Sequence, residues 1–510
     1  MKSIQYIFLL IMYCTQISAM DFTVEQRFNT MSERQRIAQL LVAAVVPNVE
    51  VNRALSKTQA YRMDPEYVKE IAVSKHQIGG ILYLGSGLIQ ERKDLTQELQ
   101  RRANGTLASF DDAEWGTQMR SSNGYKYPWN QALGALEDKY NHLIKQKGFN
   151  IAKQLQALDS QVNLGPVADV NNNPGNPVIN IRSFGSDADR VTKKVVADVN
   201  GLQDGGVAAV VKHFPGHGNT AVDSHYGLPL IEGSIEDLNN TELKPFIAAI
   251  KAGAMGVMTA HIVVPALDAS GVPATVSRKI LTDLLRNALG FKGIIVTDGM
   301  GMDGITNLYE SSEAAVKALA AGADVILGAN VANGKYNHNW EDPIGKTIDA
   351  IEQALKDGRL DKDEFHEKVM RILRMKEWAK NQRAQEIMCE YEILHQANAI
   401  KQEIYTHAIT IAQNKLSHPS NAHKIIAIRG MNKFKAQQFG ISNEMLEQIR
   451  KNHEDGKTQT VILYGSAYAV ELIKDYADCI IVAYEDDPVA QHVVEDILSN
   501  KIEAHGVMPV

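Results

Sequence analysis

The residues with the richest chemistry lie in one short segment, Lys212–His225, which reads KHFPGHGNTAVDSH. Its fourteen residues hold three histidines, one lysine and one aspartate around two glycines and a proline. Proline and glycine at these spacings break helices, so the segment is expected to run from a strand end into a loop. The apolar run before it, residues 207–211, has the pattern of a short buried strand. A buried strand that ends in titratable residues is typical of an active site at the carboxyl edge of a parallel sheet.

Asp223 and His225 stand two residues apart in this segment. In an extended chain, residues i and i+2 point to the same side, so the carboxylate of Asp223 can hold the imidazole of His225. Such a contact fixes the tautomer of the ring and tunes a proton donor near neutral pH. We therefore predict a proton-transferring dyad.

A zinc site is the alternative for these histidines, because His213, His217 and His225 could join Asp223 as ligands. Phe-Pro-Gly separates His213 from His217, so the pair shares no helical face of the HExxH kind. The sequence also has no His-x-His pair after its first candidate strand. We favour a site with no metal and no cofactor.

Asp298 is a second candidate, directly after the apolar run 293–297 and before Gly299. A carboxylate there can be a nucleophile, a metal ligand or a helix N-cap. Alone, the N-cap is the favoured interpretation. The interpretation of Asp298 as a nucleophile becomes stronger if Asp298 and the histidine-rich loop lie at the same end of a barrel, as predicted below.

Two more loops carry groups that suit a polar ligand. The segment 110–120, FDDAEWGTQMR, places Asp112 and Glu114 beside Trp115, and carboxylates next to an aromatic ring suit a sugar. A solvated loop is the alternative there. The segment 171–182, NNNPGNPVINIR, ends at Arg182. That arginine either grips a ligand oxygen or pairs at the surface with a nearby carboxylate, Asp187 or Asp189.

Short apolar runs alternate with amphipathic helical patterns from about residue 35 to about residue 330. Strict alternation implies parallel strands joined by right-handed crossovers. Eight such runs predict an α/β fold, a TIM-type (β/α)8 barrel with its site at the carboxyl ends of the strands. The candidate strands are 39–44, 80–84, 107–111, 162–169, 207–212, 254–260, 293–298 and 324–327, and the candidate helices are 90–104, 138–159, 187–203 and 235–252. The polar residues that follow the third to seventh strands are Asp111, Asp112, Asp169, Asn171, Lys212, His213, His261 and Asp298.

The pattern restarts after a charged helical segment, 361–383, that is predicted to run into a linker. Candidate strands 424–427, 460–464 and 479–483, with helices 467–476 and 488–499, indicate a smaller α/β unit. A chain of 510 residues also exceeds one ordinary core. We predict a signal peptide over 1–19, a barrel catalytic domain over 20–385 and a short, sandwich-like α/β domain over 386–510.

The first residues match a secretory signal: Lys2, an apolar run 7–12, and small residues before a cut after Ala19. The run is too short to span a bilayer, and Tyr13 before Cys14 fits a lipid-attachment box poorly. The remaining cysteines are Cys389 and Cys479. A disulfide between them is one possibility, but two separate buried thiols are favoured. No later segment has transmembrane length, so we expect an exported protein, periplasmic or secreted.

Composition narrows the class of partner. Hydrophobic residues make up 45% of the chain and charged residues 22%, as in globular proteins. The net charge of −7 has no long run of one sign, so nucleic acid is not an expected partner.

KHFPGHG followed by DSH, with VTDGM downstream, resembles glycoside hydrolase family 3, and within it the bacterial β-N-acetylhexosaminidases. PATVSR (273–278) and the closing IIVAYED and GVMPV stretches extend the resemblance. Family β-glucosidases share the Lys-His pair but not the Asp-x-His dyad. EWG at residues 114–116 departs from the EGG of many members, so the rim of the sugar pocket is expected to differ.

The resemblance implies that Asp298 is the catalytic nucleophile, His225 the general acid/base and Asp223 its partner. It implies that the hydroxyls of the first sugar are held by Asp112, Arg182, Lys212 and His213, while His217 shapes the loop. The implied enzyme is a retaining exo-β-N-acetylhexosaminidase that releases terminal N-acetylglucosamine from cell-wall muropeptides or chitin-type oligosaccharides. A retaining glycosidase needs one attacking carboxylate and one acid for the leaving oxygen, and the dyad histidine would supply the acid.

Three alternatives stay open. A histidine acid/base repels phosphate less than a carboxylate does, so phosphorolysis could replace hydrolysis. The sugar could be glucose, as in β-glucosidases of the family. An inactive carbohydrate-binding barrel predicts a missing catalytic group, yet Asp298, Asp223 and His225 are all present.

Overall fold

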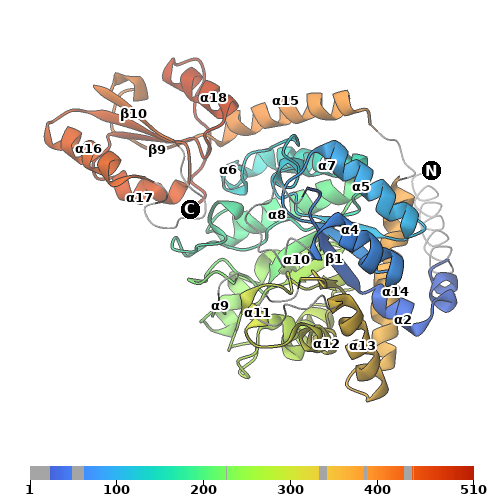
Figure 1. Ribbon diagram of the computed structural model, residues 1–510. Coiled ribbons are helices and arrows are strands. Elements are labelled where there is room, and N and C mark those ends of the chain that lie inside the picture. The colour runs from blue at the N-terminus through green and yellow to red at the C-terminus, as the bar shows by residue number, and fades with distance from the viewer. Residues whose placement is uncertain are drawn as a thin grey trace, which may run out of the picture.

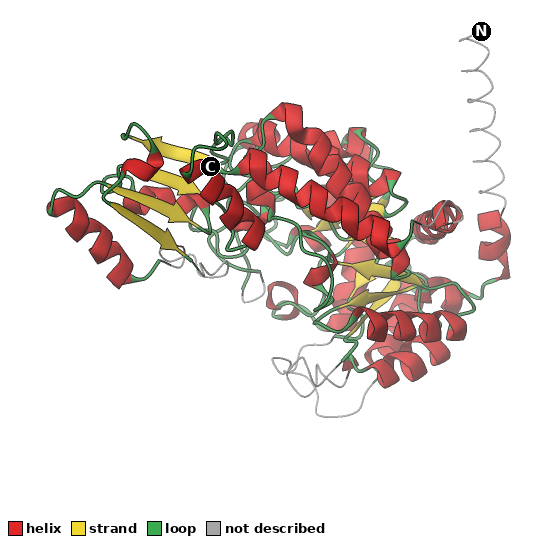
Figure 2. Cartoon of the chain, turned by 90° about the horizontal axis from the view of Figure 1, so that it is seen from above, coloured by secondary structure: helices red, strands yellow, loops and turns green. Residues whose placement is uncertain are grey.

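The computed structural model describes residues 23–48, 62–224, 227–331, 342–383, 388–429, 439 and 441–510. The predicted signal peptide over 1–19 lies outside the described residues. Two sheets organise the described chain, one of eight strands and one of four. Helices surround the larger sheet, and the smaller sheet stands to one side of it (Figures 1 and 2).

The larger sheet is the predicted barrel. Its strands pair in the order β7-β6-β5-β4-β3-β2-β1-β8, and each neighbouring pair is parallel. A parallel bridge between Val296 and Val325 links its two ends. The strands are β1 Leu41–Val45, β2 Gly80–Tyr83, β3 Ala108–Asp111, β4 Val162–Asn163, β5 Ala208–Phe214, β6 Gly256–Thr259, β7 Ile294–Val296 and β8 Ile326–Leu327. The (β/α)8 prediction is confirmed.

Strand β4 is much shorter than the predicted run 162–169. Regular pairing ends at Asn163, and Pro166, three residues later, has no N–H to give to a ladder. The chain rejoins β5 at an isolated bridge between Val167 and Lys212. The contact is made by Ala168 N–H, which donates to Lys212 O at 2.7 Å. The residues after this bridge, including Asp169, are therefore carried beside the end of β5.

The barrel helices follow most of the predicted amphipathic stretches. The region 235–252 is the exception, since it forms two helices, α9 and α10, with Pro245 in the first turn of the second. The helices are α2 Glu33–Ala38, α4 Pro65–Tyr67, α5 Ile89–Arg102, α6 Asn130–Gly134, α7 Asn141–Ala157, α8 Ala188–Asp204, α9 Ile235–Asn240, α10 Lys244–Lys251, α11 Asp303–Thr306, α12 Ser311–Ala321, α13 Pro343–Lys356 and α14 Lys362–Arg383. Shorter or less regular helical segments are η1 Val68–Lys75, η2 Thr117–Met119, η3 Asp138–Tyr140, η4 Asn180–Arg182, η5 Ala274–Val276 and η6 Lys279–Ala288.

The start and end of helix α8 show how the local sequence positions strand β5. The helix begins at Asp187, whose carboxylate caps Arg190 N–H at 2.7 Å. It ends at Gly205 and Gly206, and Gly206 has φ +88, a conformation that glycine adopts without strain. The chain can therefore turn at once into β5, which is buried along its whole length.

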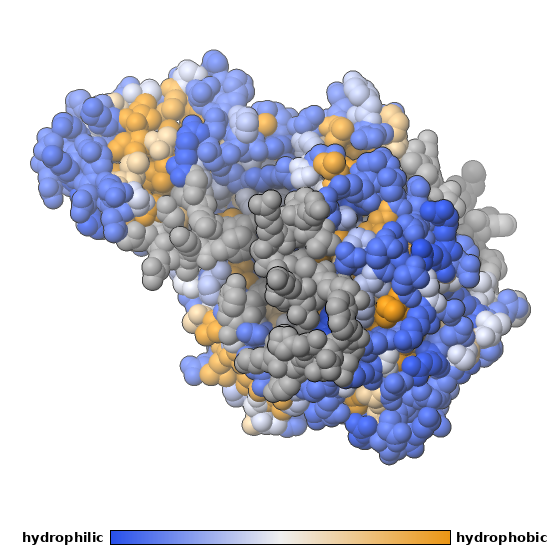
Figure 3. All heavy atoms as spheres, viewed as in Figure 1, coloured by the Kyte–Doolittle hydropathy of each residue, from blue (hydrophilic) through white to orange (hydrophobic). Residues whose placement is uncertain are grey.

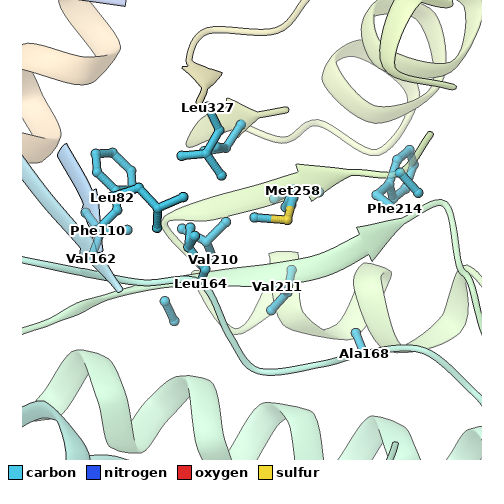
Figure 4. Packing of buried hydrophobic residues seen from close by; sticks show 14 of the residues in the cluster. Leu82, Phe110, Val162, Leu164, Ala168, Val210, Val211, Phe214, Met258 and Leu327 are labelled. Atoms are coloured by element: carbon cyan, nitrogen blue, oxygen red, sulfur yellow. The ribbon is translucent and has the colours of Figure 1, made fainter. Parts of the chain in front are cut away.

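The barrel core is a continuous apolar cluster. Side chains from successive strands meet inside it (Figure 4), and they include Leu82, Phe110, Val162, Val210, Met258 and Leu327. Each of these residues is at most 4% exposed. Close packing of this kind fixes the strand ends and the side chains that follow them.

The smaller sheet has the order β10-β11-β12-β9, with β9 antiparallel at one edge. Its strands are β9 Thr410–Asn414, β10 Lys424–Ile428, β11 Gln459–Leu463 and β12 Cys479–Val482. Its helical segments are α15 Glu390–Ala408, η8 Pro419–Asn421, α16 Asn443–Glu454, η10 Ala467–Ala469, α17 Val470–Ile473 and α18 Pro488–Leu498. The predicted smaller α/β unit is confirmed, but β9, α15 and α16 had no counterpart in the prediction. Strand β9, TIAQN, is short and half-exposed, so it carries little hydrophobic signal.

Helix α15 joins the two parts of the chain, because it packs on α6 and α7 of the barrel and on α18 of the smaller unit (Figure 1). Among its coloured residues, the face shown in Figure 3 is mostly hydrophilic, with apolar side chains gathered over the small sheet near β10, where Ile425 is 48% exposed. Among the described helices, none has the length and apolar run needed to cross a bilayer. Cys389 is exposed and Cys479 buried, and both are free thiols. The expected burial of Cys389 is therefore wrong, since it caps an exposed helix start at α15.

Candidate active site

Lys212 lies at the centre of a buried ionic cluster at the carboxyl end of β5. Its Nζ atom is 2.7 Å from Asp112 Oδ1 and 2.9 Å from Glu114 Oε1. The Lys212 side chain is only 3% exposed. Arg120 binds the second oxygen of Asp112. The loop after β3 is thus an ordered arm of the barrel mouth, and its interpretation as a solvated loop is wrong.

Arg182 completes this cluster from the loop after β4. Its guanidinium makes a two-pronged contact with Glu114, at 2.7 and 3.0 Å, and also donates to Val178 O at 3.1 Å. Its Nη2 atom lies 3.5 Å from His213 Nε2. The alternative partners were the neighbouring carboxylates, but Asp187 caps α8 instead and Asp189 pairs with Lys244. Arg182 therefore points into the barrel mouth.

The electrostatics keep this cluster charged. Burial alone would raise the pKa of Asp112, but the positive charges of Lys212 and Arg120 hold that pKa well below its usual value. Burial likewise opposes ionisation of Glu114, and Arg182 and Lys212 overcome it and lower the pKa of that carboxyl. The pKa of Lys212 is raised, because the two carboxylates outweigh the effect of burial. The result is a set of ionised donors and acceptors with fixed positions.

His213, next to Lys212, is oriented by Asp169. Its Nδ1 atom lies 2.7 Å from Asp169 Oδ2, and its backbone N–H donates to Oδ1 at 3.2 Å. Burial opposes ionisation of Asp169, but the charge of His213 outweighs it and lowers the pKa of the carboxyl. An ionised carboxylate only accepts hydrogen bonds, so Nδ1 of His213 carries the proton. Its Nε2 atom, on the other side of the ring, lies 3.5 Å from Arg182 Nη2.

The imidazole ring of His217 contacts two hydroxyl groups of its own loop. Thr220 Oγ1 donates to His217 O at 3.0 Å and so accepts from Nδ1 at 2.7 Å, while Nε2 lies 3.1 Å from Ser224 Oγ. Its backbone N–H donates to Asp169 at 2.7 Å. Burial lowers the pKa of His217 to about 4, so the ring is neutral at neutral pH. These bonds tie Thr220 and Ser224 to the ring of His217, and its loop-shaping role stays a prediction.

Asp298 lies two residues after the end of β7, and its Oδ1 accepts the N–H of Gly299 at 2.7 Å. The helix after it, α11, begins only at Asp303, so the N-cap interpretation of Asp298 is wrong. His217 follows β5 and Asp298 follows β7 of the same parallel sheet, so the two residues lie at the same end of the barrel. His261, after β6, lies 3.1 Å from Gly299 O through Nε2 and 2.8 Å from Thr275 Oγ1 through Nδ1. His261 therefore steadies the turn that carries Asp298.

The proposed dyad is only partly visible. Asp223 is half-buried in the loop after β5, whereas His225 lies outside the described residues. Ser224 between them is buried and accepts the N–H of Gly304 in α11 at 3.1 Å. The loop is thus tied at Ser224 to the segment that follows Asp298, and the contact between Asp223 and His225 stays a prediction. Within the described ranges, no three His, Cys, Asp or Glu side chains gather in a metal-binding arrangement.

Two residues carry more of the site than the sequence indicated. Glu114 joins Arg182 to Lys212, and Asp169 holds both His213 and His217. Both had been noted, Glu114 beside Trp115 and Asp169 at a strand end, but neither received a role. Their signal was a carboxylate just beyond an apolar strand, which cannot reveal its partners on other strands.

In (β/α)8-barrel enzymes the active site lies at the carboxyl end of the strands. The buried, ionised cluster of this chain lies at that end, and its charged groups suit a polar ligand. A model of the glycosyl hydrolase family 3 N-terminal domain matches residues 32–375. The chain belongs to glycosyl hydrolase family 3, and the resemblance carried by KHFPGHG and VTDGM is confirmed.

Relatives and solved structures agree with this assignment. The chain is 33% identical over 326 residues to beta-hexosaminidase A of Pseudoalteromonas piscicida, which covers 60% of this chain and 54% of that protein. It is 32% identical over 358 residues to beta-hexosaminidase LpqI of Mycobacterium tuberculosis, which covers 68% of this chain and 83% of that one. A family 3 beta-N-acetylglucosaminidase structure from Paenibacillus sp. str. FPU-7 matches with a TM-score of 0.74 at 26% identity, over 94% of this chain and 99% of that chain. The match therefore spans about half the length of the first relative and nearly all of the Paenibacillus chain.

Proposed function

We propose that the chain is a retaining exo-β-N-acetylhexosaminidase. Its proposed substrates are cell-wall muropeptides or chitin-type oligosaccharides with terminal N-acetylglucosamine. The names of the beta-hexosaminidase relatives and of the Paenibacillus beta-N-acetylglucosaminidase support this substrate class. The N-terminal pattern of residues 1–19 supports export to the periplasm or the medium.

In the proposed mechanism, Asp298 attacks the anomeric carbon and forms a covalent glycosyl-enzyme. His225, held by Asp223, gives its proton to the leaving oxygen and then takes one from the attacking water. An imidazole with an ordinary pKa of about 6.5 suits both steps near neutral pH. No metal or cofactor takes part in the proposed reaction.

The observation that carries the proposal is the ionised cluster at the barrel mouth. Lys212, Asp112 and Arg182 offer charged donors and acceptors at fixed positions, and His213 offers an oriented ring nitrogen. Charged groups that are already in place bind hydroxyls without a further ordering cost. We propose that these four residues hold the hydroxyls of the first sugar.

The decisive experiment labels the nucleophile. The enzyme is incubated with a 5-fluoro N-acetylglucosaminyl donor, digested, and its labelled peptide is sequenced by mass spectrometry. Label on the peptide that holds Asp298 supports the reaction class, the stereochemistry and the nucleophile together. Asp298→Ala should take no label and should lose at least about 10³-fold in kcat on an activated N-acetylglucosaminide. Wild-type turnover by Asp298→Ala would overturn the proposal.

Two other activities are separated by the same assay. Release of N-acetylglucosamine 1-phosphate only when phosphate is added would indicate a phosphorylase. A panel of aryl glycosides tests the sugar, because one relative, at 29% identity, is named a beta-N-acetylglucosaminidase/beta-glucosidase of Cellulomonas fimi. Faster hydrolysis of the glucoside than of the N-acetylglucosaminide would contradict the proposed specificity.

A further inference from the structure

The smaller α/β unit touches the loop that carries Arg182. The contacts come from residues 466–468, which lie after β11 at the start of η10 and which we name the brace. Tyr468 Oη lies 2.8 Å from Asn171 Nδ2, and the same hydroxyl donates to Asn171 O. Ser466 Oγ donates to Asn180 Oδ1 at 3.1 Å. All four residues are buried, so these bonds are made away from competing water.

Asn171 and Asn180 in turn shape the loop. Asn171 Oδ1 accepts the N–H of Asn180 at 2.9 Å, which ties the start of the loop to its end. Asn180 has φ +41, in the left-handed region that few residues other than glycine and asparagine adopt. The turn η4 begins at this residue and ends at Arg182. The two side chains that the brace holds are therefore the ones that set the direction of the backbone before Arg182.

The brace reaches Arg182 by a second route, through α6. Ala467 N–H donates to Gln131 Oε1 at 2.8 Å, and the neighbouring Asn130 donates from Nδ2 to Arg182 O at 2.8 Å. Both α6 residues are buried. Thus one short segment of the smaller unit contacts each of the two elements that fix the backbone of Arg182.

We propose that Ser466 and Tyr468 are positioning residues for sugar binding, and that the smaller unit thereby contributes to the first sugar site of the barrel. Neither side chain needs to touch the sugar, since both act through Asn171, Asn180 and Arg182. This inference rests on the proposed role of Arg182 in holding a sugar hydroxyl.

The test is Tyr468→Phe, which removes the hydroxyl and keeps the ring. We expect the KM for an aryl N-acetylglucosaminide and the inhibition constant of free N-acetylglucosamine to rise together by about 5-fold, with kcat changed less than about 2-fold. Ser466→Ala, which removes one bond instead of two, should raise both constants by about 2-fold.

Tyr484→Phe is the matched control. The Tyr484 hydroxyl is also buried, but its bond, 2.7 Å to Thr410 Oγ1, lies within the smaller unit. Both Tyr→Phe variants should lower the midpoint urea concentration of unfolding by similar amounts. Only Tyr468→Phe should change the inhibition constant. Equal inhibition constants for the two variants would overturn the inference.

A double-mutant cycle tests whether the effect runs through the arginine. In an Arg182→Met background, Tyr468→Phe should change the inhibition constant less than about 2-fold, because the positioned group is already absent. A full 5-fold effect in that background would overturn the inference. If Arg182→Met alone left the inhibition constant unchanged, the sugar-binding role of Arg182 itself would fail. If Arg182→Met raised it and Tyr468→Phe did not, only the brace would fail.

Discussion

Asp169 Oδ2 lies 2.7 Å from His213 Nδ1, which joins the loop after β4 to the end of β5. The other oxygen of the same carboxylate accepts the backbone N–H of His217 at 2.7 Å. One buried carboxylate therefore fixes the tautomer of His213, which is proposed to bind the sugar. The same carboxylate fixes the backbone at the start of the loop that leads to Asp223. Because both roles belong to the same carboxylate, one substitution at Asp169 tests them together.

Asp169→Asn should impair both catalysis and stability. An amide has only one acceptor oxygen, so at least one of the N–H groups facing it is left unpaired in a buried place. We expect kcat/KM to fall by about 10- to 100-fold and the free energy of unfolding by about 2 kcal/mol. Activity assays and urea unfolding measure the two effects. Asp187→Asn is the control, because asparagine still caps α8 and should change neither. Wild-type values for Asp169→Asn would contradict the assigned role.

Lys212→Met should expose the cost of the ionic cluster. The change removes the cation shared by Asp112 and Glu114, and the loss of a charged hydrogen-bond partner in a buried place costs about 3 kcal/mol. Unfolding in urea at pH 7 measures the loss. Adding Glu114→Gln to this variant should lower the stability further, because it takes the negative charge away from Arg182. The control Lys193→Met removes a surface pair with Asp138 and should cost less than about 1 kcal/mol. A Lys212→Met protein as stable as wild type would refute this account.

His217 makes stability depend on pH. Its pKa in the folded protein is about 4, below the ordinary 6.5, since burial disfavours the charged ring. The unfolded chain therefore binds the proton more tightly, and stability is complete above about pH 6.5 and falls as the pH drops towards 4. Between pH 7 and pH 5 this one group should cost the wild type about 2 kcal/mol.

The variant His217→Gln isolates this contribution. It has no titrating ring, so its unfolding free energy should fall less than that of wild type over the same pH interval. The comparison needs both proteins unfolded in urea at pH 7 and pH 5. Since Asp169, His213 and Asp298 also act on this ring, the difference between the two proteins is the relevant quantity. Parallel pH profiles would show that His217 is not the group responsible.

The two cysteines should differ in reactivity. Cys389 is exposed, whereas Cys479 is buried in β12, where burial raises the pKa of its thiol to about 11. A chain without residues 1–19 should therefore release one equivalent of colour with Ellman's reagent when native and two when unfolded. Cys389→Ser should remove the fast reaction and leave the slow one. Absence of any free thiol after unfolding would instead indicate a disulfide between them.

The barrel and the positions of its polar strand ends could be predicted from the amino-acid sequence. Apolar runs of strand length, separated by amphipathic helical runs, leave little choice but parallel strands. Proline and glycine after Phe214 required a loop, and Asp298 had to follow β7. The resemblance to family 3 then attached roles to these positions, and those roles stay proposals for the dyad and the nucleophile.

The contacts between side chains from distant segments could not be predicted and were found in the folded chain. Glu114 binds Arg182 across a separation of 68 residues, and Tyr468 reaches Asn171 across 297. Strand β9 pairs antiparallel with β12, although its segment is only weakly apolar. Periodicity reports how each segment faces the core, whereas such partners depend on how separate segments come together in the packed molecule. That information belongs to the whole fold and to no single stretch of it.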